Sequence, residues 1–218
     1  MFYHDTIILL FAKAPVAGSV NTRLIPDIGV EKATQLQYDL IHHRLSMLTK
    51  ANLSVVKLMC APDIQDACFV KCENQYQIDL LTQAGNDLGE RMLNAVKSAL
   101  QDYKYCIVIG TDAPALDEYN IEQAIELLHA DADVVFVPAE DGGYVLLGLQ
   151  NAHAFLFQEI DWGSASVMQQ SRNQLKRNKI PYRELATCWD VDRLEDYLRY
   201  LNDLSLSARN YDGRKSIG

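Results

Sequence analysis

The 218-residue sequence predicts an α/β fold in three layers, with helices on both faces of a mixed, mainly parallel sheet. Short runs of almost entirely apolar, often β-branched residues are typical of strands buried on both faces. Longer segments between them repeat apolar residues at the helical period, and the two kinds of segment alternate along the chain. The composition, 49% apolar and 22% charged, is that of an ordinary globular protein.

Five apolar runs predict the strands, in chain order Thr6–Ala12, Leu53–Cys60, Tyr105–Ile109, Asp133–Val137 and Tyr144–Leu149. Four apolar stripes predict helices, namely Val30–Lys50, Leu88 to Ala99, Ile121 to Leu128 after a capping box of Asn120 and Gln123, and Leu194 to Leu201. We interpret these stripes as core positions. Residues 1–204 form one predicted domain, and residues 205–218 form a polar C-terminal tail.

The formal net charge of −9 argues against non-specific binding to nucleic acid or to an anionic membrane. A few local cations and a metal ion can still reverse the field within one cleft, so a nucleotide substrate is compatible with this charge. The apolar run near the N-terminus is too short for a signal peptide or a membrane span, which favours a cytoplasmic protein.

Five cysteines, an odd number without a Cys-x-x-Cys pair, are typical of reduced core thiols. The spacing of Cys68-x3-Cys72 could contact a metal, but no pair of His or Cys residues elsewhere completes a zinc pattern. We interpret the five histidines, among them His42 within the first helix, as structural or surface residues.

A loop with two cations and a glycine follows the first strand. It contains Lys13, Gly18 and Arg23. Glycine allows the backbone to approach a phosphate closely, and the cations can balance its charge. The spacing matches neither a P-loop nor a dinucleotide-binding fingerprint. A strand-to-helix turn with two exposed cations explains the same residues equally well.

Acidic residues follow other predicted strands. Asp112 comes at the carboxyl end of the third one, where α/β sheets place their ligand sites, and Pro114 fixes the turn. Asp190 and Asp192 alternate, so in an extended chain they face the same side. Carboxylates placed in this way can hold Mg²⁺ or Mn²⁺ against a phosphate. The structural alternative is that Asp112 and Asp192 cap the turn or helix that follows each of them.

Two further segments carry polar groups next to glycines. Asp141 precedes Gly142 and Gly143, which permit either the approach of a ligand or a simple hairpin turn. Asp87 caps the helix that it begins, or it reaches the cleft together with Arg91. Several acids at separate strand ends, beside a cationic loop, form the set that is needed to bind a nucleoside phosphate through a divalent ion.

In order along residues 6–200, six motifs resemble a known family: Phe11-Ala-Lys-Ala-Pro15 with Gly18 and Thr22-Arg-Leu24, Asp87-Leu-Gly-Glu-Arg-Met92, Gly110-Thr-Asp-Ala-Pro114, Pro138-Ala-Glu-Asp-Gly-Gly-Tyr144, Trp162-Gly163, and Asp190-Val-Asp192 with Glu195-Asp196. The set resembles a bacterial family of small GT-A-like transferases, often labelled glycosyltransferase and also called radical-SAM/selenodomain-associated transferases. Related folds include the molybdenum-cofactor and 2-phospho-L-lactate guanylyltransferases. The resemblance implies a nucleotide-diphospho-sugar transferase fold, a divalent metal, and transfer of a sugar or nucleotidyl group.

The resemblance also implies roles for the matching residues: Lys13 and Arg23 bind phosphate, Asp112 binds the metal with Asp190 or Asp192 as the second acid, and Glu140 to Tyr144, including Gly142 and Gly143, lie on the acceptor side. We predict further that Gly18 and Asp87 take part in nucleotide binding, and that Asp141 or Glu140 deprotonates an acceptor hydroxyl. One residue departs from the family pattern. Asn21 stands where the family usually has Lys, which removes one cation from the loop.

Two functions follow as hypotheses. The first is a metal-dependent transferase that passes a nucleotidyl group from a nucleoside triphosphate, or a sugar from a nucleotide-sugar, to a small-molecule acceptor. The alternative is a non-catalytic nucleotide-binding or regulatory protein on the same fold, for which Asn21 is the main support.

Overall fold

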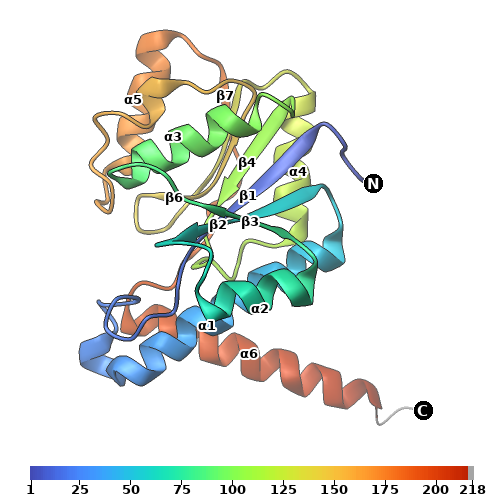
Figure 1. Cartoon of the computed structure of the whole chain (residues 1–218), viewed down its shortest axis with the longest axis vertical. Coiled ribbons are helices and arrows are strands. Elements are labelled where there is room, and N and C mark those ends of the chain that lie inside the picture. The colour runs from blue at the N-terminus through green and yellow to red at the C-terminus, as the bar shows by residue number, and fades with distance from the viewer. Residues whose placement is uncertain (216–218) are drawn as a thin grey trace.

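Figure 1 shows a computed structural model, which describes the backbone of residues 1–215 and the side chains of residues 1–204. Its centre is a seven-stranded sheet in the order β3-β2-β1-β4-β6-β5-β7. The strands are β1 (Thr6–Lys13), β2 (Val55–Ala61), β3 (Asp79–Thr82), β4 (Tyr105–Ile109), β5 (Val134–Pro138), β6 (Tyr144–Leu149) and β7 (Tyr182–Glu184).

The sheet is mixed and mainly parallel, as the sequence predicts. Only β6 runs antiparallel to its neighbours β4 and β5 among the described strands. The carboxyl ends of β1, β4 and β5 therefore share one edge with the start of β6. The chain leaves β1 towards β2 and β3 and returns on the other side as β4. The edge between β1 and β4 is thus a topological switch point, where α/β sheets bind ligands.

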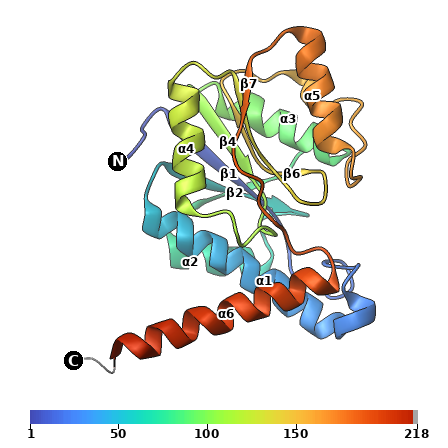
Figure 2. The same ribbon diagram turned by 180° about the vertical axis from the view of Figure 1, so that it is seen from behind.

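Helices cover both faces of the sheet (Figures 1 and 2). Their bounds are α1 (Ile25–Ala51), α2 (Ala67–Tyr76), α3 (Leu88–Ala99), α4 (Glu118–His129), α5 (Val167–Asn178) and α6 (Leu194–Lys215), with a 3-10 turn at Ala154–Leu156. Alternate residues of β1 enter two separate cores, because successive strand side chains point to opposite faces. Ile8 packs with residues of α1, α2 and α4, whereas Ile7 packs with residues of α3 and α5.

Some elements differ from the sequence prediction. The sequence prediction missed α2, α5, β3 and β7, which are short or polar: β3 is mostly exposed, and α5 carries few apolar residues. Helix α1 begins earlier, at Ile25, and bends at Gly29, whose φ of 82° is left-handed. The capping box of α4 joins Asp117 to Asn120 rather than Asn120 to Gln123, so α4 begins at Glu118.

Helix α6 crosses the predicted boundary between residues 204 and 205, and residues 216–218 of the predicted tail lie outside the described residues. The division into domain and tail therefore stays a prediction. Before α6, Trp189 and Val191 pack with Leu36 and Leu40 of α1, and Tyr200 of α6 joins them. This small third core fixes the extended segment that carries Asp190 and Asp192.

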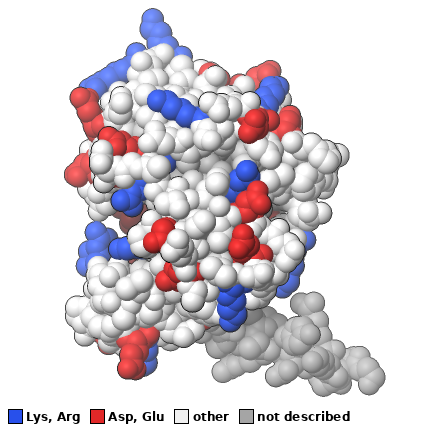
Figure 3. All heavy atoms as spheres, viewed as in Figure 1, with Lys and Arg blue, Asp and Glu red and all other residues white. Residues whose placement is uncertain are grey.

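The composition also led to predictions about the cysteines, membrane-spanning segments and surface charge. All five cysteines are unpaired and buried, as predicted for core thiols. Among the described residues, no helix has the length and apolar character needed to cross a bilayer. Figure 3 shows Lys, Arg, Asp and Glu side chains interspersed on the face in view, without a continuous basic patch.

Candidate active site

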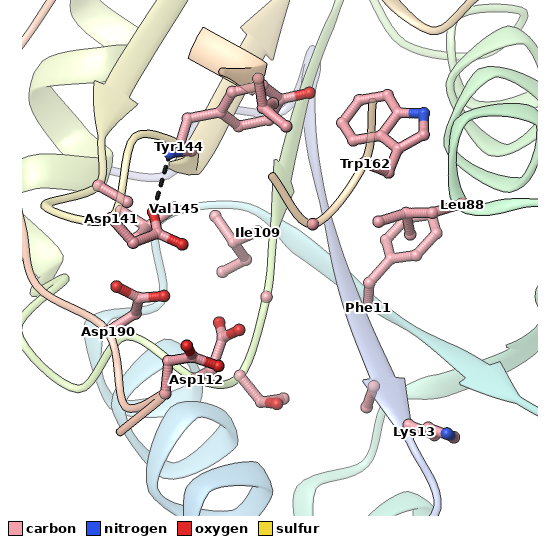
Figure 4. A pocket seen from close by; sticks show the side chains of 18 of the residues that line it. Phe11, Lys13, Leu88, Ile109, Asp112, Asp141, Tyr144, Val145, Trp162 and Asp190 are labelled. Carbon is pink, nitrogen blue, oxygen red and sulfur yellow. Dashed lines mark hydrogen bonds between the residues drawn. The ribbon is translucent and has the colours of Figure 1, made fainter. Parts of the chain in front are cut away.

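A cavity of about 720 Å³ lies at the switch point between β1 and β4 (Figure 4). Its two sides differ in chemistry. Acids gather on one side, apolar side chains form the other, and Lys13 projects from the end of β1. The acidic side comprises Asp112, Asp141, Asp190 and Asp192, and the apolar side includes Phe11, Leu88, Tyr144 and Trp162.

Asp112 owes its position to the turn that follows the fully buried strand β4. A Cβ atom on Gly110 would lie 2.8 Å from Oδ1 of Asp112, so the glycine leaves room for the carboxylate. Beneath the turn, the guanidinium of Arg44 donates hydrogen bonds to the backbone carbonyls of Ala113 and Leu116. Arg44 is completely buried, and this fork holds the turn in place.

Asp190 is brought to Asp112 by backbone hydrogen bonds. Cys188 pairs with the end of β5: its N–H donates to Pro138, and its carbonyl accepts from Glu140. Three residues on, the N–H of Val191 donates to the carbonyl of Asp112 at 2.8 Å. The extended segment thus crosses the sheet edge from β5 to β4, and Asp190 lies on that path.

Asp141 occupies the turn between β5 and β6. Its Oδ1 accepts a hydrogen bond from the N–H of Gly143 at 2.8 Å, drawn as the dashed line in Figure 4. Gly142 has a φ of 92°, and a Cβ there would lie 2.2 Å from the carbonyl oxygen of Ala165. The hairpin-turn alternative is therefore present in the structure, and the same turn directs Asp141 into the cavity.

Three carboxylates of the acidic side repel one another. Burial raises the pKa of Asp190 to about 7, and the charges of Asp112 and then Asp141 add to the shift. The Asp112 carboxylate is open to the cavity but deep within it, and this loss of water raises its pKa, with further contributions from Asp141 and Asp192. Within residues 1–204, no ion pair involves Asp112, Asp141 or Asp190.

This repulsion predicts that the Asp190→Asn variant gains stability over the wild type only as the pH rises. The pKa of Asp190 is higher in the folded than in the unfolded state, so ionisation penalises the folded state progressively from pH ~4 through 7 and fully above. Urea unfolding of both proteins in EDTA, from pH ~5 to ~8, measures the difference in unfolding free energy. We expect a smaller advantage of the variant at the acidic end and a larger one at the alkaline end. A pH-independent difference would show that Asp190 is not perturbed.

The cations of the β1 loop have partners of their own. The Lys13 ammonium donates to the carbonyl of Ser19 at 2.7 Å and lines the cavity. Asn21 has a left-handed φ of 47°, and its side-chain amide donates to the carbonyl of Ala33 in α1 at 3.0 Å. Asn21 therefore anchors the loop to α1. The longer Lys side chain would not make this hydrogen bond in the same way.

Arg23 and Asp192, which the sequence assigned to phosphate and metal respectively, bind each other. Nη1 of Arg23 lies 2.9 and 2.8 Å from the two carboxylate oxygens of Asp192. Arg193 adds a second guanidinium contact to Asp192 at 3.3 Å. Of the two acids that could have completed the metal site, Asp190 is therefore the one without an ion pair in the described part of the chain.

Several predicted residues lie elsewhere. Gly18 is exposed and does not line the cavity, because the loop carries it outwards. Asp87 caps α3 by accepting a hydrogen bond from the N–H of Glu90, so its carboxylate is used locally. Glu140 faces a second cavity of about 330 Å³ and pairs with Arg199 at 3.2 Å. Gly142 packs on Ala165, whereas Gly143 and Tyr144 do line the main cavity.

The structure adds residues that the sequence analysis did not assign. Arg91, considered there only as an alternative, lines the cavity, and its Nε donates to the carbonyl of Gly85. Gln37 and Gln83 also line it and donate to backbone carbonyls at the ends of β1 and β2. Arg44 was missed, although a basic residue that continues the apolar stripe of α1 is a readable signal of a buried cation.

One protein family and one solved structure are similar to this chain in sequence. The family model that matches residues 44–164 is described as an uncharacterized protein conserved in bacteria (DUF2064). A solved structure from Desulfovibrio desulfuricans G20, described as a nucleotide-diphospho-sugar transferase, is 30% identical with a TM-score of 0.78; the alignment covers 88% of this chain and 84% of that chain. No curated protein matches the sequence.

More distant structures share the fold. CMP:2-keto-3-deoxy-manno-octonic acid synthetase complexed with CTP gives a TM-score of 0.60 at 10% identity, over 94% of this chain and 99% of that chain. Rv0371c from Mycobacterium tuberculosis H37Rv in complex with manganese gives a TM-score of 0.57 at 16% identity, over 92% and 99%. The chain has the GT-A-like fold of nucleotide-diphospho-sugar transferases.

Proposed function

Since the chain belongs to the bacterial family DUF2064, which carries no functional description, we propose its activity from the site. The proposal is a transferase that uses a nucleoside triphosphate or a nucleotide-sugar as donor and depends on Mg²⁺ or Mn²⁺. The related structure from D. desulfuricans, described as a nucleotide-diphospho-sugar transferase, supports the same class.

The observation that carries the proposal is a group of three carboxylates in one cavity with Lys13 and Arg91. None of the three forms an ion pair with a side chain of residues 1–204. Alone, Asp112, Asp141 and Asp190 would repel a phosphate. With a divalent cation among them the sign of the field inverts, and the cations complete a site for a nucleoside di- or triphosphate. Binding of the nucleotide should therefore require the metal.

The residues present fit a hard divalent cation. Carboxylate oxygens are the ligands that Mg²⁺ and Mn²⁺ prefer. Burial, and then the charges of neighbouring acids, raise the pKa values of Asp112 and Asp190, so a cation among them would relieve this repulsion. Asp112 and Asp190 would hold the ion, while Asp192 stays with Arg23. A bound ion neutralises phosphate charge and so stabilises a departing pyrophosphate or nucleoside diphosphate.

Other residues of the cavity would bind the donor phosphates, accept a proton and contact the base or sugar. Lys13 and Arg91 attract the donor phosphates. Asp141, which lines the main cavity, would accept the proton of an acceptor hydroxyl in glycosyl transfer, whereas Glu140 pairs with Arg199 outside that cavity. The apolar side gives a base or sugar a surface to pack on, since Phe11 and Trp162 present rings to the cavity.

A non-catalytic nucleotide-binding protein remains the second candidate. Two observations favour it: Asp192 neutralises the charge of Arg23, and Asn21 supplies no charge. The β1 loop should therefore bind phosphate weakly. The two candidates differ in turnover: an enzyme releases pyrophosphate or nucleoside diphosphate when the acceptor is present, and a binding protein does not.

A thermal-shift screen of nucleoside triphosphates and nucleotide-sugars, each with Mn²⁺ or with EDTA, tests the proposal. A ligand that binds only the folded state raises the melting temperature. We expect a shift that requires both metal and nucleotide. A shift with triphosphates alone indicates nucleotidyl transfer, and a shift with nucleotide-sugars alone indicates glycosyl transfer. Equal shifts in EDTA, or none with any nucleotide, would contradict the proposal.

We predict that the Lys13→Gln variant binds the nucleotide found in the screen roughly tenfold more weakly, because a charge-assisted hydrogen bond to phosphate contributes about 1.5 kcal/mol. Isothermal titration calorimetry in Mn²⁺ measures the change. The matched control is Lys57→Gln, since Lys57 pairs with Asp79 away from the cavity. If both variants bind like the wild type, Lys13 does not contact phosphate.

A further inference from the structure

A second group of ligand-type side chains lies between α1 and α2. His42 of α1 and Cys68 and Cys72 of α2 each offer one atom, and these three atoms lie within 4.8 Å of one another. The two cysteines are one helical turn apart, so their side chains share a face. None of the three lines the cavity of the candidate active site.

Hydrogen bonds set the orientation of the His42 ring. The Tyr76 hydroxyl lies within donating distance of the backbone carbonyl of His42, at 3.2 Å, and 3.0 Å from Nδ1 of the same residue. When the Tyr76 hydroxyl donates its proton to the carbonyl, the hydroxyl oxygen can accept a hydrogen bond from Nδ1–H of His42. In this tautomer Nε2 carries no proton and keeps its lone pair free for a metal ion. Nε2 lies 3.9 Å from Sγ of Cys72. An outer partner that fixes the imidazole tautomer is typical of histidines that bind metals.

Burial and neighbouring groups act differently on the protonation of the three side chains. Burial, and then the charge of Lys71, lower the pKa of His42, so the imidazole is neutral at pH 7. The hydrogen bond with Cys68, and then burial, raise the pKa of the Cys72 thiol, so a metal ion must displace its proton on binding. The charge of the Lys71 ammonium, which the Tyr38 hydroxyl holds at 2.6 Å, acts in the opposite direction. Both cysteines are buried beside Phe69, which limits access of solvent.

We propose that His42, Cys68 and Cys72 bind a thiophilic metal ion of the Zn²⁺ class, at a site separate from the candidate active site. Two sulfurs and one imidazole nitrogen are soft ligands that suit Zn²⁺ rather than Mg²⁺. Tetrahedral zinc with Zn–S of about 2.3 Å and Zn–N of about 2.0 Å needs S···N separations of about 3.5 Å, so the observed 3.9 Å requires only a small adjustment. Three protein ligands leave one coordination position open.

Titration of the reduced, metal-free full chain with Co²⁺ tests this site. Cobalt bound to thiolates gives an intense ligand-to-metal charge-transfer absorption in the near ultraviolet, whereas cobalt bound to carboxylates does not. The readout therefore separates this site from Asp112 and Asp190. We expect the band to saturate at one ion per chain and to disappear when Zn²⁺ is added, because zinc thiolates do not absorb there. Absence of the band in the reduced wild-type protein would overturn the proposal.

Variants identify the ligands. Cys72→Ser and His42→Gln should each weaken Co²⁺ binding at least about tenfold. Cys106→Ser is the matched control, since Cys106 is an equally buried thiol on the opposite side of the sheet, and it should keep the band. The Asp112→Asn variant should also keep it. Circular dichroism confirms that each variant is folded, and Zn²⁺ should raise the melting temperature of the wild type more than that of Cys72→Ser. Bands unchanged in Cys72→Ser and His42→Gln would contradict the assignment.

Discussion

Replacing Asp112 with Asn should abolish Mn²⁺-dependent nucleotide binding and, at the same time, raise the melting temperature of the metal-free protein. Asparagine keeps the shape of the side chain but removes one charge from the group formed with Asp141 and Asp190. That charge is unfavourable in the folded state, since the pKa of Asp112 is raised by burial and by its acidic neighbours. Its removal also takes away one proposed metal ligand, so affinity for the metal–nucleotide pair should fall roughly 100-fold or more.

The rise in melting temperature in EDTA should be modest, roughly 2–4 °C, which corresponds to about 1 kcal/mol in a chain of this size. Water in the open cavity screens part of the repulsion. Calorimetric titration and thermal melts of both proteins measure the two effects. Asp102→Asn, a change at an exposed acid outside the cavity, is the control. Wild-type affinity in Asp112→Asn would refute the metal assignment, and a lower melting temperature in EDTA would refute the repulsion.

Replacing Arg44 with Met should cause the largest loss of stability, about 2–5 kcal/mol, because each buried carbonyl left without its donor costs about 1–3 kcal/mol. Met fills much of the volume of Arg44 but leaves the carbonyls of Ala113 and Leu116 without their donor. These carbonyls belong to the turn that carries Asp112, so the variant should also lose metal-dependent binding. Arg44→Lys keeps the charge but cannot reproduce the two-pronged donation, and we expect an intermediate stability.

Urea unfolding in EDTA measures the free energies of these variants. Lys50→Met is the matched control, because Lys50 lies exposed on the same helix, and its change should remain within about 0.5 kcal/mol. Burial already lowers the pKa of Arg44 to about 10, which indicates how far the guanidinium is removed from water. An Arg44→Met protein within about 1 kcal/mol of the wild type would show that the hydrogen bonds of Arg44 to the turn contribute little.

Most of the fold could be predicted from the sequence because the strands of the sheet centre are continuous apolar runs. β1, β4, β5 and β6 have five to eight residues each, nearly all buried, and the sequence located each of them within one residue. Short edge strands give no such signal: β3 and β7 alternate little and are mostly exposed. Helix α5 was not predicted for a similar reason: most of its residues are long and polar, and few of them are buried.

The site was predictable where it depends on strand ends and not where it depends on tertiary pairing. Parallel strands bring their carboxyl ends to one edge, so Asp112, Asp141 and Lys13 could be placed together from the chain alone. That Arg23 would pair with Asp192, 169 residues away, has no sequence signal. Asp87 shows the opposite case: its capping role was readable from its position before α3, and the cap is what the structure contains.

The proposed thiophilic site illustrates the same limit. Cys68-x3-Cys72 was visible in the sequence but lacked a partner, and His42 is an ordinary mid-helix residue when read along the chain. Only the packing of α1 against α2 brings the imidazole to the two sulfurs. A metal site assembled from separate helices is therefore found by geometry rather than by spacing.

Anomalous scattering from crystals grown with Mn²⁺ and the nucleotide that gives the largest thermal shift tests the proposed metal site most directly. We expect a manganese peak next to the carboxylates of Asp112 and Asp190, with the nucleotide phosphates between that peak and Lys13. Nucleotide density in the cavity without manganese at these carboxylates, or manganese and nucleotide bound elsewhere on the protein, would contradict the proposal.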